Sequence, residues 1–235
     1  MRKVWSLLNL ILPEQCPICN RPSDNLKTSP LCSCCWDLIR AGGAKRRCLR
    51  CGIALDTTYD TSCLECIKDP PFYEKVYVFG DYDGHLREAI HYMKFHGRKN
   101  LSKVLGNLLG MLDIPDVDAI IPVPLGRRRL VQRGFNQSYL LARRLSVISS
   151  VPVLDDLLLK KTETPPQSLL SRQERLRNQR GSFSLNPNYQ KIPRRVALVD
   201  DVVTTTATVN ECARVLKKAG VKEVYVIALA RAISV

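Results

Sequence analysis

After residue 71, apolar and polar positions follow two alternating patterns that together predict a parallel α/β domain. Four consecutive apolar residues at 196–199 are typical of a strand buried on both faces, and the apolar run 119–125 predicts a second strand. Helical periodicity marks three further segments, near 86–97, at 139–145 and at 209–218. The predicted fold class is therefore α/β, with a mostly parallel sheet flanked by helices.

The first 70 residues have few periodic runs and most of the cysteines. Eight of the ten cysteines form four C-x-x-C pairs, with 12 residues between the first two pairs and 11 between the last two. A C-x-x-C turn places two thiolates on one side, and two such turns complete a tetrahedral sulfur site for zinc. We therefore expect one or two structural zinc sites, built from Cys16, Cys19, Cys32, Cys35, Cys48, Cys51, Cys63 and Cys66.

Several details of the cysteine pattern stay open. The pairs can combine in chain order or with the middle two exchanged, and one of the sites can be without metal. Cys34, beside Cys35, makes the register of the second pair ambiguous. Disulfides are the alternative to zinc, and the lack of a secretory signal argues against them. Cys212 falls on the apolar face of a predicted helix, which is typical of a small buried hydrophobe.

A domain boundary is predicted at 68–71, where Lys-Asp-Pro-Pro interrupts regular structure. It separates residues 1–70, a cysteine-rich module that needs metal for much of its folding free energy, from residues 71–235, the α/β domain. Near the N-terminus, the apolar run 4–12 follows two basic residues. Nine residues are too few to span a bilayer, so no transmembrane segment is expected. We expect a short helix packed on the protein, with docking to a membrane or partner as the alternative.

The basic residues are concentrated in one window of the chain. There are 36 Lys and Arg against 22 Asp and Glu, a net charge of +14. Residues 120–195 contain 15 basic and four acidic residues, which accounts for the whole net charge of +11 of residues 71–235. Such a field suits a polyanion, either a pyrophosphate-bearing ligand or a nucleic acid. The alternative is a solvated basic surface without a partner.

A strand, two acids and a hydroxyl-rich turn follow one another at 196–208. A helix that begins after such a turn offers free N–H groups and partial positive charge to a phosphate, and threonine hydroxyls add donors. Ionised Asp200 and Asp201 can each accept a hydrogen bond from one of two vicinal hydroxyls. Phosphate together with a diol predicts a site for a ribose 5-phosphate.

Three further segments carry candidate phosphate ligands. The 119–125 strand ends in prolines and leads into an arginine run at 127–133, which we expect to form a pyrophosphate-binding loop because arginine binds phosphate bidentately. The polar stretch 164–178 is long enough to close over a substrate and bring Arg175 to the reacting centre; the alternative is a solvated linker. Lys94 can reach a phosphate from the end of a predicted helix, whereas His91 and His96 are expected to be surface or packing residues.

The 196–208 segment resembles the phosphoribosyl pyrophosphate (PRPP) loop of type I phosphoribosyltransferases. The resemblance implies that Asp200 and Asp201 bind the ribose hydroxyls and that 204–208 cradles the 5-phosphate. Many members have Gly where this chain has Thr206, so either the turn is helical there or phosphate binding is weakened. The implied PRPP-binding residues are Asp200, Asp201, Val202, Val203, Thr204, Thr205, Thr206, Ala207 and Thr208.

Motifs along nearly the whole chain, from about residue 7 to residue 231, resemble the competence protein F (ComF/GntX-type) family. They are the four C-x-x-C pairs, Asp-Pro-Pro-Phe, Met-Lys-Phe-His-Gly, Pro-Val-Pro-Leu, Arg-Gly-Phe-Asn-Gln-Ser, the 167–178 stretch and Asp-Asp-Val-Val-Thr-Thr. The resemblance implies a zinc module joined to a phosphoribosyltransferase domain and a role in DNA uptake during natural transformation. It also implies single-stranded DNA and DNA-uptake machinery as partners, and a location that is cytoplasmic or peripheral at the inner membrane.

Two hypotheses of different class follow. In the first, a DNA-uptake protein binds PRPP with Mg²⁺ and handles single-stranded DNA; in the second, a Mg²⁺-dependent phosphoribosyltransferase acts on an unidentified nucleobase or amine. No helix-turn-helix pattern supports a transcription regulator. The predicted catalytic residues are Asp200, Asp201 and Arg175, and the pyrophosphate ligands are Arg127, Arg129, Arg133 and Lys94. The predicted nucleic-acid ligands are Arg127, Arg128, Arg129, Arg133, Arg172 and Arg177, with Tyr82, Tyr92, Phe95, Phe135 and Tyr139 as candidates for base stacking.

Overall fold

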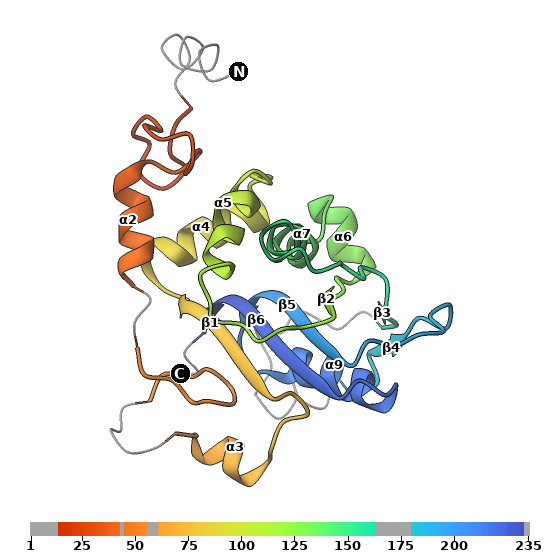
Figure 1. Ribbon diagram of the computed structural model, residues 1–235. Helices are drawn as coiled ribbons and strands as arrows, with labels where there is room; N and C mark the ends of the chain where they lie inside the picture. The colour runs from red at the N-terminus through yellow and green to blue at the C-terminus, as the bar shows by residue number, and fades with distance from the viewer. Residues whose placement is uncertain (1–13, 43–44, 56–60, 163–179, 233–235) are drawn as a thin grey trace.

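The computed structural model describes residues 14–42, 45–55, 61–162 and 180–232. Its centre is a four-stranded sheet with the order β1-β6-β5-β2, in which all neighbouring strands run parallel (Figure 1). The strands are β1 (Lys75–Asp81), β2 (Ala119–Pro122), β5 (Arg195–Val203) and β6 (Glu223–Arg231). This sheet confirms the predicted α/β class.

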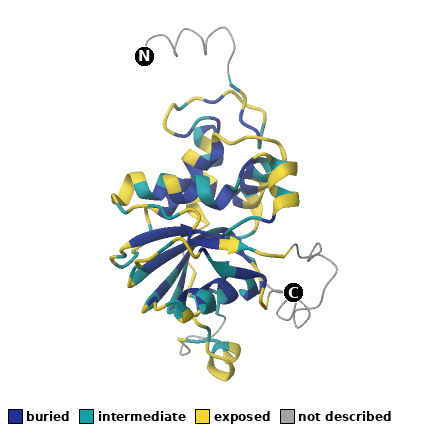
Figure 2. Ribbon diagram, turned by 90° about the vertical axis from the view of Figure 1, so that its right-hand side faces the viewer, coloured by how far each residue is buried: buried dark blue, intermediate teal, exposed yellow. Residues whose placement is uncertain are grey.

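Helices cover both faces of the sheet and make two separate cores. On one face lie α4 (Gly84–Phe95), α5 (Leu101–Leu109) and α7 (Gln137–Ser149), and α2 (Ser33–Ala41) packs on α4. On the other face lie α9 (Ala207–Lys218) and a small antiparallel hairpin of β3 (Leu158–Lys160) and β4 (Phe183–Leu185). The central strands are buried between these layers (Figure 2). Burial on both faces explains why residues 196–199 are uninterruptedly apolar.

Strand β5 is longer than predicted, because it continues through the two acids to Val203. Its neighbour β6 pairs with it along this extension, with Asp200 opposite Ala228. The neighbour on the other side, β2, ends at Pro122 opposite Val199. Prolines at 122 and 124 have no N–H to offer a ladder, so the pairing stops there. The carboxylates therefore lie where one side of β5 is open, at the sheet edge that typically binds ligands.

The prediction of an arginine loop at 127–133 is wrong, because these residues form a helix, α6 (Arg127–Arg133). Arginine is a good helix former, and the segment between Gly126 and Gly134 contains no glycine or proline. Gly134 ends the helix in the left-handed conformation, with φ of 73°. The next helix, α7, begins at Gln137 rather than at 139, because the Asn136 side chain accepts a hydrogen bond from the backbone N–H of Ser138 (3.0 Å).

The cysteine-rich module packs against the sheet domain. Leu31 and Ile39 belong to the same core as Met93 and Leu105, so α2 and its flanking turns cover α4. The second half of the module is attached by charge: the buried Asp81 accepts from Lys45 Nζ at 2.6 Å and from Arg47 Nη1 at 2.8 Å. A short helix, α3 (Leu64–Lys68), ends the module. The boundary at 68–71 stays a prediction.

Two of the sequence predictions fall outside the described residues, namely the apolar helix at 4–12 and the closing loop at 164–178. In the parts of the chain that the structure describes, no helix has the length and apolar character needed to cross a membrane.

Candidate functional site

Two adjacent carboxylates at the open edge of β5 are held by donors from two helices. The buried Asp201 contacts Lys94 Nζ of α4 at 2.8 Å through Oδ1, and its Oδ2 accepts from Gln137 Nε2 of α7 at 3.1 Å. The half-buried Asp200 accepts through Oδ1 from Ser138 Oγ (3.0 Å) and from the backbone N–H of Asp201 (2.8 Å). The site is therefore assembled by β5, α4 and α7 together.

Burial sets the electrostatics of the pair. Desolvation, with added repulsion from Asp201, raises the pKa of Asp200 to about 7. Lys94 and Ser138 oppose this shift. Burial also lowers the pKa of the half-buried Arg133, which the two carboxylates partly restore. The Asp200 carboxyl group therefore changes its charge near neutral pH, in a site that also contains the partly buried cations Lys94 and Arg133.

Gln137 carries an acceptor without a partner. Its Oε1 is buried and has no hydrogen bond among the described residues, while its Nε2 is occupied by Asp201. A buried polar atom left unpaired costs about 1–3 kcal/mol. Gln137 is therefore held in place at a cost, which its hydrogen bond to the buried Asp201 offsets.

The turn between β5 and α9 has an unusual backbone. Thr206 lies in the left-handed region, with φ of 62°, and is the residue immediately before the helix. A β-branched residue is strained there. Of the two alternatives given for Thr206, a right-handed helical turn is therefore excluded, and weakened phosphate binding stays a prediction. The Thr206 hydroxyl donates to the carbonyl of Thr205 (2.6 Å), and its own carbonyl accepts from the backbone N–H of Asn210 (2.8 Å). Within the turn Thr204 is exposed and Thr205 is buried.

A buried arginine, which the sequence analysis missed, fixes the start of this turn. Arg231 ends β6 and has 4% of its surface exposed. Its Nη1 donates to the carbonyl of Val203 (3.0 Å) and to that of Thr204, and its Nε donates to the carbonyl of Cys51 (3.0 Å). The only signal in the sequence was a lone charge at the end of an apolar strand.

Eight cysteines form two compact groups, in the chain order of their pairs. The first cage is Cys16, Cys19, Cys32 and Cys35, and the second cage is Cys48, Cys51, Cys63 and Cys66; within each the Sγ atoms lie within 4.8 Å of one another. This excludes the exchanged pairing.

The dimensions of both cages suit zinc. Sulfur atoms bound to zinc at about 2.3 Å in a tetrahedron lie about 3.8 Å apart. The Sγ atoms of Cys19 and Cys32 are 3.6 Å apart, as are those of Cys51 and Cys63. In the first cage, Arg21 Nε donates to the Cys19 Sγ (3.4 Å) and lowers the pKa of this thiol to about 6, which favours the thiolate that zinc requires. None of the ten cysteines is paired in a disulfide, and the grouping of eight of them in fours favours zinc over the disulfide alternative.

The two remaining cysteines lie outside the cages. Cys34 is exposed, which settles the register of the second pair. Cys212 is fully buried on α9, as predicted.

The predicted phosphate ligands divide into three groups. Lys94 and Arg133 lie at the carboxylates. Arg129 is near enough to Arg133 to lower its pKa by repulsion, whereas Arg127 and Arg128 are exposed on α6. The structure does not describe Arg172, Arg175 and Arg177.

The fold and the two cysteine cages together define a class of protein. In this class, two cysteine cages of the zinc-ribbon type precede a parallel α/β domain, which has an acidic pair at the carboxyl end of its sheet. Residues 7–67 match the family model described as a double zinc ribbon domain. The chain belongs to the competence protein F family. It is 37% identical over 213 residues to competence protein F of Haemophilus influenzae, which covers 86% of this chain and 90% of the relative.

Other relatives extend over most of the chain. DNA utilization protein YhgH of Escherichia coli strain K12 is 33% identical, covering 94% of this chain and 99% of the relative. Competence protein ComFC of Streptococcus pneumoniae is 29% identical, covering 86% and 88%.

Two solved structures show lower similarity. The glutamine PRPP amidotransferase of Bacillus subtilis has a TM-score of 0.38 at 23% identity, over 54% of this chain and 25% of that larger chain. The purine phosphoribosyltransferase of Pyrococcus horikoshii has a TM-score of 0.28 at 18% identity, over 59% of this chain and 81% of that chain. The family assignment rests on the sequence relatives.

We expect two zinc ions per chain in purified protein, measured by elemental analysis. Cys66→Ser opens the second cage and should reduce the content to one ion and lower the melting temperature, because structural zinc contributes directly to folding. Cys34→Ser and Cys212→Ser are matched controls that should retain two ions. A wild-type protein without zinc would contradict the assignment of both cages.

Stability should depend on pH through Asp200. The pKa of Asp200 is higher in the folded state than in the unfolded state, so the protonated carboxyl group favours the folded state. This stabilisation is fully present below about pH 4 and is lost as the pH rises towards 7. The side chain of Asp200→Asn cannot ionise, so this variant does not lose that stabilisation. When the pH is raised from 5 to 8, its free energy of unfolding should increase relative to that of wild type by at most about 3 kcal/mol. Thermal melts at both pH values test this. The exposed Asp116→Asn, which also removes one charge, should show no such gain.

Proposed function

We propose that the protein binds PRPP with Mg²⁺ at the open edge of β5 and acts on single-stranded DNA during DNA uptake. The observation that carries the ligand assignment is the Asp200–Asp201 pair, in which Asp201 contacts the Gln137 amide and Lys94 and both carboxylates act electrostatically on Arg133. The observation that supports the DNA role is membership of a family whose named relatives include competence and DNA utilization proteins.

The ribose is proposed to lie against the acidic pair. Its 2- and 3-hydroxyls would donate to Asp200 and Asp201, which remain acceptors while ionised. The Gln137 amide donates to Asp201 and so helps to hold that acceptor in place. Two carboxylate acceptors at one edge of a sheet suit a diol better than an anion, because an anion would be repelled by the carboxylates.

The phosphates are proposed to lie on either side of the sugar. The turn 204–208 would take the 5-phosphate at the beginning of the twelve-residue helix α9, where free backbone N–H groups and the exposed Thr204 lie. Arg133, Lys94 and Arg129 would face the pyrophosphate. Mg²⁺ would neutralise that pyrophosphate, with carboxylate and phosphate oxygens as its ligands.

The DNA role is proposed to use the exposed cations of α6. Arg127 and Arg128 are exposed, and they belong to the window that carries most of the positive charge of the α/β domain. Phosphate contacts supply most of the affinity in binding that does not depend on sequence. The proposed place of action is the cytoplasmic side of the inner membrane, in contact with the DNA-uptake machinery.

Calorimetric titration with PRPP and Mg²⁺ tests the ligand assignment. Replacing both acceptors, as in Asp200→Asn/Asp201→Asn, should weaken binding at least about 100-fold, because each hydrogen bond to a charged group contributes about 1.5–3 kcal/mol. The chain offers a matched control in its other adjacent acidic pair: Asp155→Asn/Asp156→Asn changes two exposed residues and should bind as wild type does.

Folded wild-type protein that binds no PRPP would overturn the ligand assignment. If PRPP binds, release of pyrophosphate on addition of nucleobases or amines then separates a transferase from a protein that only binds the ligand.

Affinity for single-stranded DNA should fall with salt concentration. Each phosphate contact contributes a slope of about −0.7 to log K against log salt. The triple variant Arg127→Ala/Arg128→Ala/Arg129→Ala should therefore reduce the magnitude of the slope by about 2. A control of equal charge, Lys27→Ala/Arg40→Ala/Lys68→Ala, removes exposed cations of the N-terminal module. An equal loss in both variants would show that net charge, rather than α6, governs binding.

A further inference from the structure

A run of exposed rings lies on α4 and on the residue that follows it. We call His91, Tyr92, Phe95 and His96 the ring platform. Ring centroids are 4.9 Å apart for His91 and Phe95, 5.4 Å for His91 and His96, and 4.8 Å for Tyr92 and His96. Phe95 has 56% of its surface exposed, His91 and His96 are also exposed, and Tyr92 is half-buried. Tyr92 packs partly against the core, whereas His91, Phe95 and His96 lie outside it; α4 reaches the core mainly through Met93 and Ile90.

The platform leads to the carboxylate site. The Arg133 guanidinium lies over the Phe95 ring, 4.8 Å from its centroid, and the same guanidinium interacts with Asp200 and Asp201. Lys94, between these rings in sequence, binds Asp201. Arg133 therefore connects the rings with the acidic pair.

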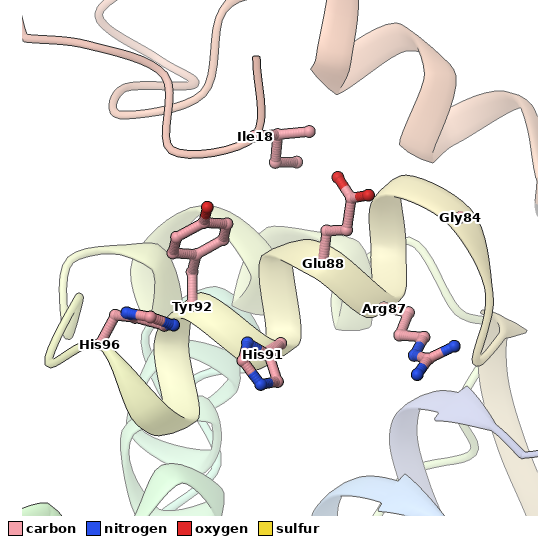
Figure 3. A pocket seen from close by; sticks show the side chains of 7 residues that line it. All are labelled: Ile18, Gly84, Arg87, Glu88, His91, Tyr92 and His96. Carbon is pink, nitrogen blue, oxygen red and sulfur yellow. The ribbon is translucent and has the colours of Figure 1, made fainter. Parts of the chain in front are cut away.

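A groove of about 520 Å³ accompanies the platform along α4. Figure 3 shows Tyr92 and Glu88 pointing towards Ile18 of the first cysteine cage, while His91 and Arg87 lie on the other side of the helix. Glu88 would repel a phosphate, so the favourable path for a polyanion follows the side of Arg87, His91 and Arg133. Exposed Arg98 and Lys99 lie just beyond the end of α4.

We propose that the ring platform stacks the bases of single-stranded DNA, whose phosphates lie along the neighbouring cations. The inference deepens the DNA role proposed above and depends on it. Rings flanked by arginine and lysine are the combination that single-stranded nucleic acid requires, because bases stack on the rings and the backbone pairs with the charges. Among the predicted stacking residues, Phe95 lies beside His91 and Arg133 on this path, whereas Tyr92 lies with Glu88 on the side towards Ile18 and Phe135 is buried.

The test compares two strands with the same phosphates. A labelled oligonucleotide of about twelve thymidines is titrated by fluorescence anisotropy beside an abasic strand of equal length. Wild type should prefer the thymidine strand. His91→Ala/Phe95→Ala should bind that strand about 10-fold more weakly or worse, since each stacked base contributes a comparable factor, and should bind the abasic strand as wild type does.

Two controls keep the result specific. Phe72→Ala removes another exposed phenylalanine, 48% exposed and outside the platform, and should bind both strands normally. Phe95→Trp keeps a ring at the site, so it should retain affinity, and its fluorescence should be quenched by the thymidine strand alone.

The outcomes separate the two proposals. If wild type binds both strands equally, or if the double variant weakens both equally, the platform does not stack bases and the inference is overturned while DNA binding stands. If wild type binds neither strand at low salt, the DNA role itself fails.

Discussion

One buried guanidinium holds the carboxyl end of the sheet together. Arg231 is almost completely removed from water, and a buried charge is tolerated only when hydrogen bonds satisfy it. Its partners are backbone carbonyls from a cysteine turn of the second cage, from the end of β5 and from the turn that follows. These three segments cannot separate without leaving the charge unpaired. The position of the turn at 204–208 is therefore linked to the N-terminal module.

The early end of β2 determines which side chains surround the two carboxylates at this edge of the sheet. Because the ladder stops at Pro122, the neighbouring side of β5 is free from Asp200 onward, and side chains of α4 and α7 occupy the space. Two carboxylates can be buried together there only because Lys94, Gln137 and Ser138 surround them. Even so, the pKa of Asp200 remains high. A carboxyl group whose pKa is raised by burial in this way is typical of sites that bind ligands.

Local patterns predicted the elements, and contacts distant in sequence decided what the patterns left open. The apolar run at 196–199 indicated a buried strand, but its extension to Val203 depends on β6, which lies twenty residues further on. The cysteine spacing indicated two cages, while their pairing required the fold. The arginine run was interpreted as a loop because its charge suggested phosphate, although its composition favours a helix. Gln137 and Arg231 have roles that exist only in three dimensions.

The shared core of the first cage and the sheet has a consequence for how the protein is made. Leu31 and Ile39 pack in one cluster with residues of α4 and α5, which are synthesised later. When Cys16 to Cys35 leave the ribosome, the part of their core that α4 and α5 supply does not yet exist. Until then only local contacts can order the first cage: its hydrogen-bonded turns and, through its four thiols, a metal ion.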